Sequence, residues 1–290
     1  MIFKKLMCTV TLFSTFILGA CAHHEKRASV TQIINKQQPI IIQGALPIET
    51  NRLVSKLQNT SSETLGGWTF WKGTYKGYPI IISKTRMGMS NSAAATALAI
   101  ERYKPIAIIN QGTSGGHDPK LKVFDIVLGK YTTNINAFKT PTRPQGAGSN
   151  SLTWNEAFDV LPDDESDPEP IAIRKFEGDK ELLAAANNVK HLYTHGKVVE
   201  GTLGSADVWN NELDRIAFFN KNYGTSAEEM EGASVAQIAK QFNVPFLGIR
   251  VLSNNITNNG QYDAKTGEVC QDYILDVVIE YMQMKKSKSL

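Results

Sequence analysis

The sequence predicts an α/β fold in which helices cover both faces of a central mixed β-sheet, giving three layers, α/β/α. Runs rich in β-branched apolar residues alternate along the chain with segments whose apolar residues recur at helical spacing. The chain has 290 residues, of which 42% are hydrophobic and 20% charged, so it is long enough to bury one large core. We therefore expect one domain of this fold over residues 39–290.

The first half of this domain shows strand and helix patterns in regular succession. Apolar β-branched runs closed by glycine indicate strands, Lys76-Gly77 suits a hairpin turn, and Pro105 ends an alanine-rich helix. In chain order we expect a strand at 40–44, a helix at 47–57, hairpin strands at 68–75 and 78–84, a helix at 91–103, and strands at 106–110 and 126–128. The strand at 106–110 leads into a glycine-rich turn at 111–116.

The second half repeats the alternation after an interruption. Between 139 and 175 the periodicity vanishes and Pro, Gly and acidic residues accumulate, which predicts a long loop insertion, either a functional lid or a disordered segment. The elements expected beyond it are strands at 198–203 and 246–252 and helices at 209–219, 232–242 and 269–284.

The N-terminal segment differs in composition from the rest. Two lysines precede an apolar run, Leu6–Ala20, which is short for a membrane span but typical of the central region of a signal peptide. The run ends at Cys21 in the sequence Leu-Gly-Ala-Cys, which resembles a bacterial lipobox. We predict a signal peptide at 1–20, a lipid on Cys21 and a flexible polar tether at 21–38.

The cysteines fit export, although Cys21 has a simpler interpretation as a residue that merely lies near an ordinary cleavage site. Cys8 lies in the signal segment, so Cys270 has no partner for a disulfide in an oxidising compartment and is expected to be a structural thiol within a helix. We predict attachment to a bacterial membrane, on its periplasmic or outer side. The formal net charge of +3 includes two lysines of the signal segment, which argues against a nucleic-acid partner.

Two features of the domain carry chemistry. The glycine-rich segment after the buried strand lets the backbone approach a ligand, yet it lacks the lysine of a P-loop and the spacing of a dinucleotide fingerprint. Three carboxylates, those of Glu228, Glu229 and Glu231, stand before an apolar helix, where the helix dipole favours them. A carboxylate in that place can also accept two hydrogen bonds from a vicinal diol such as ribose.

Four segments in order resemble the methylthioadenosine/S-adenosylhomocysteine nucleosidase family, within the superfamily of purine nucleoside and uridine phosphorylases. They are Ile108–Gly116, Leu121–Val127, Glu229–Glu231 and Phe242–Phe246. The resemblance runs from Ile40 to about Tyr281 and is interrupted by the insertion, which is longer than the equivalent loop of the family. It implies a nucleoside phosphorylase/hydrolase-like fold, hydrolysis of the N-glycosidic bond of a purine nucleoside, a homodimer, and no cofactor or metal.

The resemblance also implies a role for individual residues. Glu49 falls where the family keeps the general base that activates water, and a carboxylate is suited to that task. Glu231 falls on the residue that holds the ribose hydroxyls, and Trp209 where an aromatic ring stacks on the base. The full set of substrate-binding positions is Met87, Thr113, Trp209, Met230, Glu231, Arg250 and Ser253.

Asn254 departs from the family pattern. The nucleosidases have an aspartate here that donates a proton to purine N7, whereas an asparagine hydrogen-bonds N7 without transferring its proton. Trimeric purine nucleoside phosphorylases are similar in this respect, since they use asparagine to bind 6-oxopurines. An amide offers both a donor and an acceptor, so we expect either a changed base preference or a substitute from Asn255 or the loop beyond it.

Two other functions stay open on the sequence alone. A phosphate-dependent phosphorylase needs cations near the glycine-rich loop. Hexameric phosphorylases have an arginine where this chain has Asn110, and Glu49 repels phosphate, but Arg86 precedes Met87 and is a candidate phosphate ligand. A non-catalytic, nucleoside-binding lipoprotein is suggested by Asn254 and by the predicted export, whereas the presence of Glu49, Glu231 and Arg250 argues against it.

Overall fold

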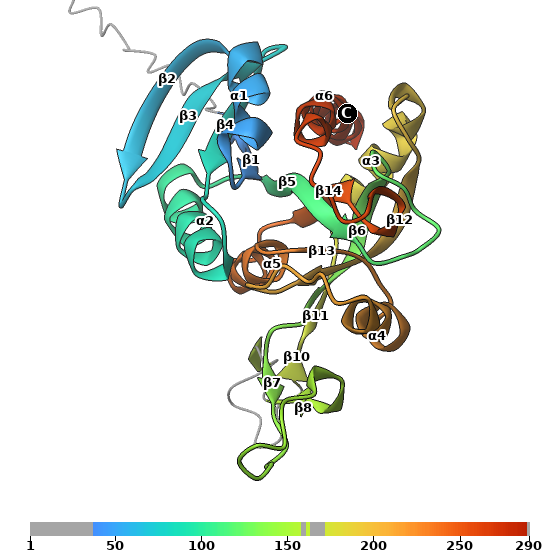
Figure 1. Ribbon diagram of the computed structural model, residues 1–290. Helices are drawn as coiled ribbons and strands as arrows, with labels where there is room; N and C mark the ends of the chain where they lie inside the picture. The colour runs from blue at the N-terminus through green and yellow to red at the C-terminus, as the bar shows by residue number, and fades with distance from the viewer. Residues whose placement is uncertain (1–36, 158–160, 163–171, 289–290) are drawn as a thin grey trace, which may run out of the picture. The chain divides into compact units, whose positions relative to one another are not determined.

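Ten strands form one mixed sheet within the part of the chain that the computed structural model describes, residues 37–157, 161–162 and 172–288 (Figure 1). They are β1 (Ile40–Gly44), β2 (Gln58–Leu65), β3 (Trp68–Tyr75), β4 (Tyr78–Lys84), β5 (Ala107–Gly116), β6 (Ile126–Asn134), β11 (Lys175–Glu177), β12 (Val198–Ser205), β13 (Thr225–Glu229) and β14 (Phe246–Asn254). The predicted signal peptide, Cys21 and all but the last two residues of the predicted tether lie outside these ranges. No helix within them is long and apolar enough to cross a membrane.

Five of the strands close into a ring. β5 pairs with β14, β14 with β6, β6 with β12 and β12 with β13, and β13 returns to β5 at Gly115 and Gly116. The parallel neighbours of β5 are β1, whose last pair with β5 joins Gln43 to Asn110, and β14. The ring therefore closes at the carboxyl ends of parallel strands, the place where open α/β sheets bind ligands.

Helices cover both faces of this sheet, which confirms the predicted three-layer α/β/α fold. Ile40 and Ile42 of β1 belong to a core shared with α1 (Pro47–Lys56), α3 (Lys180–Val189) and α6 (Lys265–Lys288). Ile41 points to the opposite face, into a core shared with α2 (Met89–Tyr103) and α5 (Gly232–Gln241) (Figure 1). This alternation follows from the two-residue period of a strand and explains why β1 is apolar throughout.

Several elements differ from the sequence predictions. The segment at 111–116 continues β5 and is not a turn, because β13 and β14 supply partners for its backbone. The helix expected at 209–219 is α4 (Leu213–Tyr223), so Trp209 lies in the loop before it. β2, β13 and α3 were not predicted. β2 is polar and largely exposed at the edge of the sheet, so it carries no apolar signal.

The insertion contains short paired strands beside the turn η1 (Ser151–Thr153). These are β7 (Phe138–Lys139) with β8 (Asn155–Glu156), and β9 (Leu161–Pro162) with β10 (Ala172–Ile173). The guanidinium of Arg215, on α4, lies over the rings of Phe138, Trp154 and Phe219, with 4.6–5.6 Å between its carbon and the ring centroids. These cation–π contacts hold the insertion against α4.

Candidate active site

A cavity of about 750 Å³ opens where the strand ring closes. Its volume suits a small organic ligand. It is lined by α1, the loop after β4, β5, the loop before α4, β13 and the loop after β14. Every predicted catalytic or substrate-binding residue except Arg250 lines it: Glu49, Met87, Thr113, Trp209, Met230, Glu231, Ser253 and Asn254. Segments far apart in the sequence thus meet at one site.

Glu49 is held rigidly by four donors at the wall of this cavity. It is the third residue of α1, after Pro47, and its side chain turns back so that Oε2 accepts bonds from the backbone N–H groups of Ala45 and Leu46, at 2.9 and 3.1 Å. Its Oε1 accepts from both the backbone N–H and the hydroxyl of Thr113, at 2.8 and 3.0 Å. The carboxylate is 4% exposed and its orientation is fixed.

Gly112 makes room for this carboxylate. A Cβ atom on Gly112 would lie 2.5 Å from Oε1 of Glu49, closer than a side chain permits. The glycine-rich sequence of β5 therefore lets a carboxylate rest on the strand backbone, so the close approach that the sequence predicted for a ligand is made by the protein's own Glu49 side chain.

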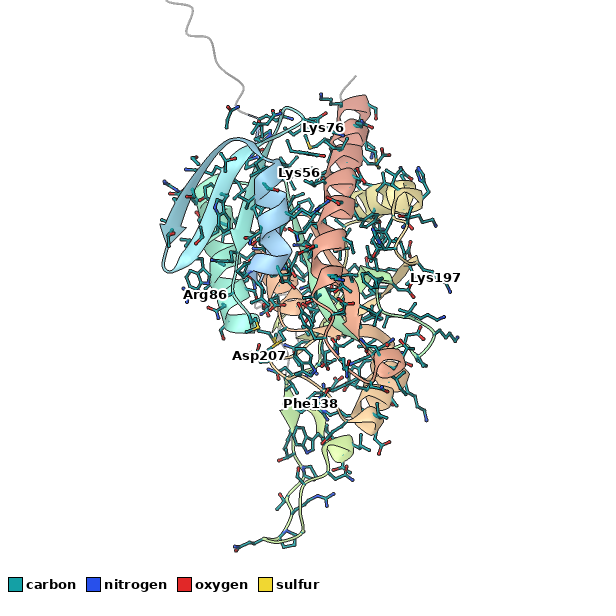
Figure 2. The ribbon with its side chains drawn as sticks, turned by 45° about the horizontal axis from the view of Figure 1, so that its top comes forward. Lys56, Lys76, Arg86, Phe138, Lys197 and Asp207 are labelled. Atoms are coloured by element: carbon teal, nitrogen blue, oxygen red, sulfur yellow. The ribbon has the colours of Figure 1, made fainter. Side chains whose placement is uncertain are left out.

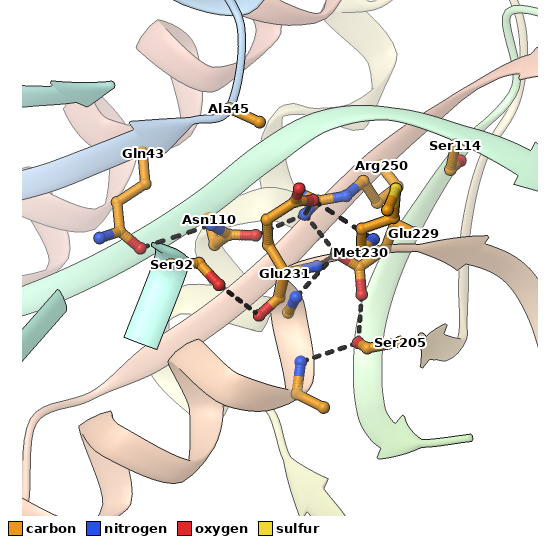
Figure 3. A network of polar contacts seen from close by, with 12 residues as sticks. Gln43, Ala45, Ser92, Asn110, Ser114, Ser205, Glu229, Met230, Glu231 and Arg250 are labelled. Atoms are coloured by element: carbon orange, nitrogen blue, oxygen red, sulfur yellow. Dashed lines mark hydrogen bonds and ion pairs between the residues drawn. The ribbon is translucent and has the colours of Figure 1, made fainter. Parts of the chain in front are cut away.

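Glu229, Glu231 and Arg250 form a buried polar network (Figure 3). One nitrogen of Arg250 donates to Oε2 of Glu229 at 2.5 Å, to Oδ1 of Asn110 at 2.5 Å and to Oε2 of Glu231 at 3.5 Å. Arg250 is only 1% exposed and lies behind the cavity wall, so it positions the carboxylates and does not contact the cavity. Arg250 is therefore a supporting residue and not the substrate-binding residue that the sequence predicted.

Glu229 caps α5, and Glu231 is left facing the cavity. Oε2 of Glu229 accepts from the backbone N–H groups of Glu231 and Gly232, and Oε1 accepts from the hydroxyl of Ser205. Oε1 of Glu231 accepts from the backbone N–H of Gly88 at 3.1 Å. Burial raises the pKa of Glu231 to about 8, with a further contribution from the negative charge of Glu229.

Asn254, the last residue of β14, presents its amide to the same cavity. The Ser253 hydroxyl lies 2.9 Å from Oδ1 of Asn254 and 3.1 Å from the backbone carbonyl oxygen of Ser114, so Oδ1 is on the Ser253 side and the amide nitrogen faces away from it. That nitrogen lies above Gly115, 3.4 Å from the position of a Cβ on that glycine. Asn255, the suggested substitute, instead donates its amide to the backbone carbonyl of Leu121 and caps the next turn.

Apolar side chains surround the mouth of the cavity. Met87 and Trp209 are 54% and 55% exposed, and Trp209 meets the ring of Tyr262 edge-on, with 6.2 Å between centroids. Tyr262 was not singled out in the sequence; burial raises its pKa, and the Thr113 hydroxyl lies near it. Other exposed apolar residues that line the cavity are Val208, Leu213 and Ile256. Such a mouth suits an apolar or aromatic ligand group.

A histidine, His117, and a further carboxylate, Glu228, also line the cavity. The sequence indicated Glu228 only as one of three carboxylates before a helix and gave no signal for His117. The Nε2 atom of His117 lies 3.3 Å from Oε2 of Glu228, and its Nδ1 lies 2.8 Å from the hydroxyl of Thr225. Asn210 binds Glu228 through both its backbone N–H and its side-chain amide. In the sequence, His117 only follows two glycines and Glu228 only lies in a polar run, so no local pattern marks the two as a cluster.

The ionisable side chains that line the cavity are mainly acidic. Among the described residues that line it there are four glutamates, Glu49, Glu228, Glu229 and Glu231, and neither lysine nor arginine. Arg86, the phosphate ligand considered from the sequence, is exposed and has its guanidinium near Gly67, so the structure does not bring it to the site (Figure 2). Within the described ranges, no group of three or more His, Cys, Asp or Glu is arranged to hold a metal ion.

Comparison with known proteins agrees with this architecture. The 5′-methylthioadenosine/S-adenosylhomocysteine nucleosidase of Bacillus licheniformis is 32% identical over 216 residues, which cover 74% of this chain and 85% of that protein. The crystal structure of such a nucleosidase from Colwellia psychrerythraea, in complex with adenine, has a TM-score of 0.67 at 25% identity and covers 85% of this chain and 96% of that chain.

A third relative shares the fold. The structure of futalosine hydrolase from Helicobacter pylori has a TM-score of 0.68 at 24% identity, covering 84% of this chain and 98% of that chain. The family model described as the phosphorylase superfamily matches residues 39–278, which hold every side chain of the cavity. The strand ring, the buried carboxylates and this match together show that the chain belongs to the phosphorylase superfamily.

Proposed function

We propose that the protein is a nucleosidase that hydrolyses the N-glycosidic bond of purine nucleosides. The observation that carries the proposal is that two carboxylates, those of Glu49 and Glu231, line the same cavity and are each fixed by a different part of the fold. Glu49 is fixed by backbone donors beside β5, and Glu231 is fixed by Gly88 beside α2. The relatives named above as nucleosidases and as a futalosine hydrolase support the same reaction class.

We assign each group a step in this reaction. Glu49 accepts a proton from water, and the oxygen of that water bonds to C1′ of the ribose. Glu231 accepts hydrogen bonds from the ribose diol and orients C1′ toward the water. The bond between C1′ and the base breaks, the base leaves with the electron pair, and Asn254 stabilises it by a hydrogen bond to N7. The base takes its proton from solvent, because the amide transfers none.

Hydrolysis agrees better with the cavity than phosphorolysis does. A phosphate dianion needs cations or several donors, and the nearest guanidinium, that of Arg250, is already bonded to Asn110 and Glu229. The carboxylate of Glu49 on the cavity wall would repel the dianion, and its burial strengthens that repulsion. A neutral water molecule meets no such barrier.

The decisive experiment uses protein without residues 1–21 and follows release of base from methylthioadenosine, S-adenosylhomocysteine, adenosine, inosine and guanosine. We expect release in phosphate-free buffer and no acceleration when phosphate is added. Release that requires phosphate would identify a phosphorylase. Saturable binding with no release would favour the nucleoside-binding protein.

The raised pKa of Glu231 predicts a proton exchange on binding. The ribose diol donates to the ionised carboxylate, so nucleoside affinity should increase as pH rises through about 8, and binding at pH 7 should release a proton. Titration calorimetry in two buffers of different ionisation enthalpy measures this release. The Glu231→Gln variant should show none, and proton uptake by the unaltered protein would contradict the role given to Glu231.

The same raised pKa has a consequence for stability. The unfolded chain releases this proton near pH 4.5, whereas the folded protein keeps it until about pH 8. The contribution of Glu231 to the free energy of unfolding therefore decreases from pH 4.5 to about 8 and is constant above that range.

We also propose export with a lipid on Cys21 and assembly as a homodimer. The lipobox-like sequence supports the first. The second is supported by the exposed apolar mouth of the cavity, where Met87, Trp209 and Leu213 are each more than half exposed. A partner subunit over this mouth would shield the site from bulk water.

A further inference from the structure

The amino ends of the parallel strands lie at the edge of the sheet that is opposite the cavity. β1, β4 and β14 run in the same direction as β5, and the cavity opens at their carboxyl ends. The helices α1, α2, α5 and α6 each follow or precede one of these strands, so they run back along the sheet and end at the amino edge. The turn between β3 and β4 lies there too, because β4 begins at it.

Each of these segments carries an exposed lysine where it ends. α1 ends with Lys56, the turn between β3 and β4 contains Lys76, and α2, α5 and α6 end with Lys104, Lys240 and Lys286. We call these five residues the basic end; Figure 2 shows Lys56 and Lys76 at the end of the molecule where α6 finishes. A lysine in a last helical turn also stabilises the helix dipole, but that reason does not apply to Lys76.

Neighbouring carboxylates neutralise only part of this charge. Glu101 pairs with Lys104 at 2.8 Å, and Asp276 lies near Lys76. Glu181 is already held by two further cations of α6, Lys285 and Lys288, at 2.5 Å each. Lys56 has no ion pair with any residue that the structure describes. The amino edge therefore has an excess of positive charge, whereas the cavity at the opposite edge is lined by carboxylates.

The chain enters the domain at the basic end. The side chain of Gln38 donates to the backbone carbonyl of Lys104 at 2.8 Å, and Pro39 leads directly into β1. Fifteen residues, 22–36, lie between Cys21 and the first described residue. An extended chain of that length spans at most about 50 Å. A lipid on Cys21 would therefore hold the basic end, and not the cavity, next to the membrane.

We propose that the basic end binds the surface of a bilayer that contains anionic phospholipids, through the lipid phosphate groups. Lysines close to such a surface each add to the attraction. Phe242, which is 40% exposed just after α5, adds an apolar side chain for the headgroup region. Bound in this way, the domain turns its cavity away from the membrane and toward the solvent from which a nucleoside arrives.

Vesicle sedimentation tests the surface with protein that lacks residues 1–21, so that no lipid on Cys21 contributes. We expect binding to vesicles of phosphatidylcholine mixed with phosphatidylglycerol, and release from them at high ionic strength. In the triple variant Lys56→Gln, Lys76→Gln and Lys286→Gln the partition coefficient should fall roughly 100-fold, about fivefold for each lysine. Equal binding to phosphatidylcholine alone would overturn the inference, as would no binding to either kind of vesicle.

The matched control removes three lysines elsewhere and so makes the same change in net charge. Lys120 and Lys122 are exposed beyond the carboxyl end of β5, and Lys221 is exposed on α4. The variant with glutamine at these three positions should bind anionic vesicles as the unaltered protein does. Equal losses in the two triple variants, with unchanged thermal unfolding, would show an effect of net charge alone and would overturn the inference.

A fluorescent label identifies the face that meets the bilayer. Cys270 is the only cysteine left without residues 1–21, and it is buried, so an introduced cysteine is labelled selectively. A polarity-sensitive fluorophore on Ser287→Cys, at the end of α6, should shift its emission on anionic vesicles, whereas one on Pro119→Cys, after β5, should not. The reverse result would overturn the inference. Neither experiment involves turnover, so its outcome is independent of the proposed nucleosidase function.

Discussion

Replacement of Glu49 by glutamine is expected to lower the hydrolytic kcat by about 10²- to 10⁴-fold, the usual contribution of a general base. Glutamine keeps the size of the side chain but has no basic oxygen to take a proton from water. The four donors around Glu49 also match a carboxylate and not an amide, since the amide nitrogen must face either Thr113 or the N–H groups of Ala45 and Leu46. Both effects act on the same residue, so the loss should be large.

Single-turnover rates and nucleoside affinity, measured on the same preparation, separate the chemical step from binding. Thr113→Val is the matched control, because it removes the hydroxyl donor to Oε1 and leaves the backbone donor at 2.8 Å. Its rate should fall much less than that of Glu49→Gln. Turnover of Glu49→Gln at the rate of the unaltered protein would remove Glu49 from the mechanism.

Substitution of Arg250 by leucine is expected to destabilise the protein by about 3–5 kcal/mol, the range for breaking a buried ion pair by removing one partner. Arg250 is fully buried and is the cation beside Glu229 and Glu231, and its interaction with Glu49 extends the effect to the third carboxylate. Without it, the buried carboxylate of Glu229 loses the cation that compensates its charge. Activity should be lost as well, because the diol-binding carboxylate loses its support.

Urea denaturation measures this loss, and Arg52→Leu is the control. Arg52 pairs with Asp272 at 2.6 Å, but both side chains are nearly half exposed, so this change should cost no more than about 1 kcal/mol. Removing a carboxylate together with the cation, as in Arg250→Leu with Glu229→Leu, should recover part of the stability. Equal effects of Arg250→Leu and Arg52→Leu would contradict the account of the buried network.

The sequence predicted those parts of the fold whose signal is local. β1, β3, β4 and α2 were recognised because apolar runs, a Lys-Gly turn and an alanine-rich segment mark them. β13 was missed because its residues, Thr225–Glu229, are mostly polar and become a strand through pairing with β5 and β12. α3 was not predicted, although its signal is local: Asp179 caps it, and Leu182, Ala185, Ala186 and Val189 follow helical spacing.

The candidate site was predictable only in part, for a similar reason. The positions of Glu49, Glu231 and Asn254 came from the resemblance to a family, and the structure brings all three to one cavity. The pairing of Glu228 with His117 depends on β13 lying beside the far end of β5, which no local pattern reveals. Arg250 lies on β14, which leads to the site, but its ion pairs with Glu229 and Glu231 hold its side chain behind the cavity wall.

The central claim is that water, and not phosphate, takes the place of the base on C1′. The most direct test is mass spectrometry of the sugar formed when the protein cleaves a purine nucleoside in water enriched in the heavy oxygen isotope, with phosphate present. The account predicts free sugar that carries one heavy oxygen atom, and loss of that product in Glu49→Gln. A sugar 1-phosphate without the heavy isotope would contradict the account.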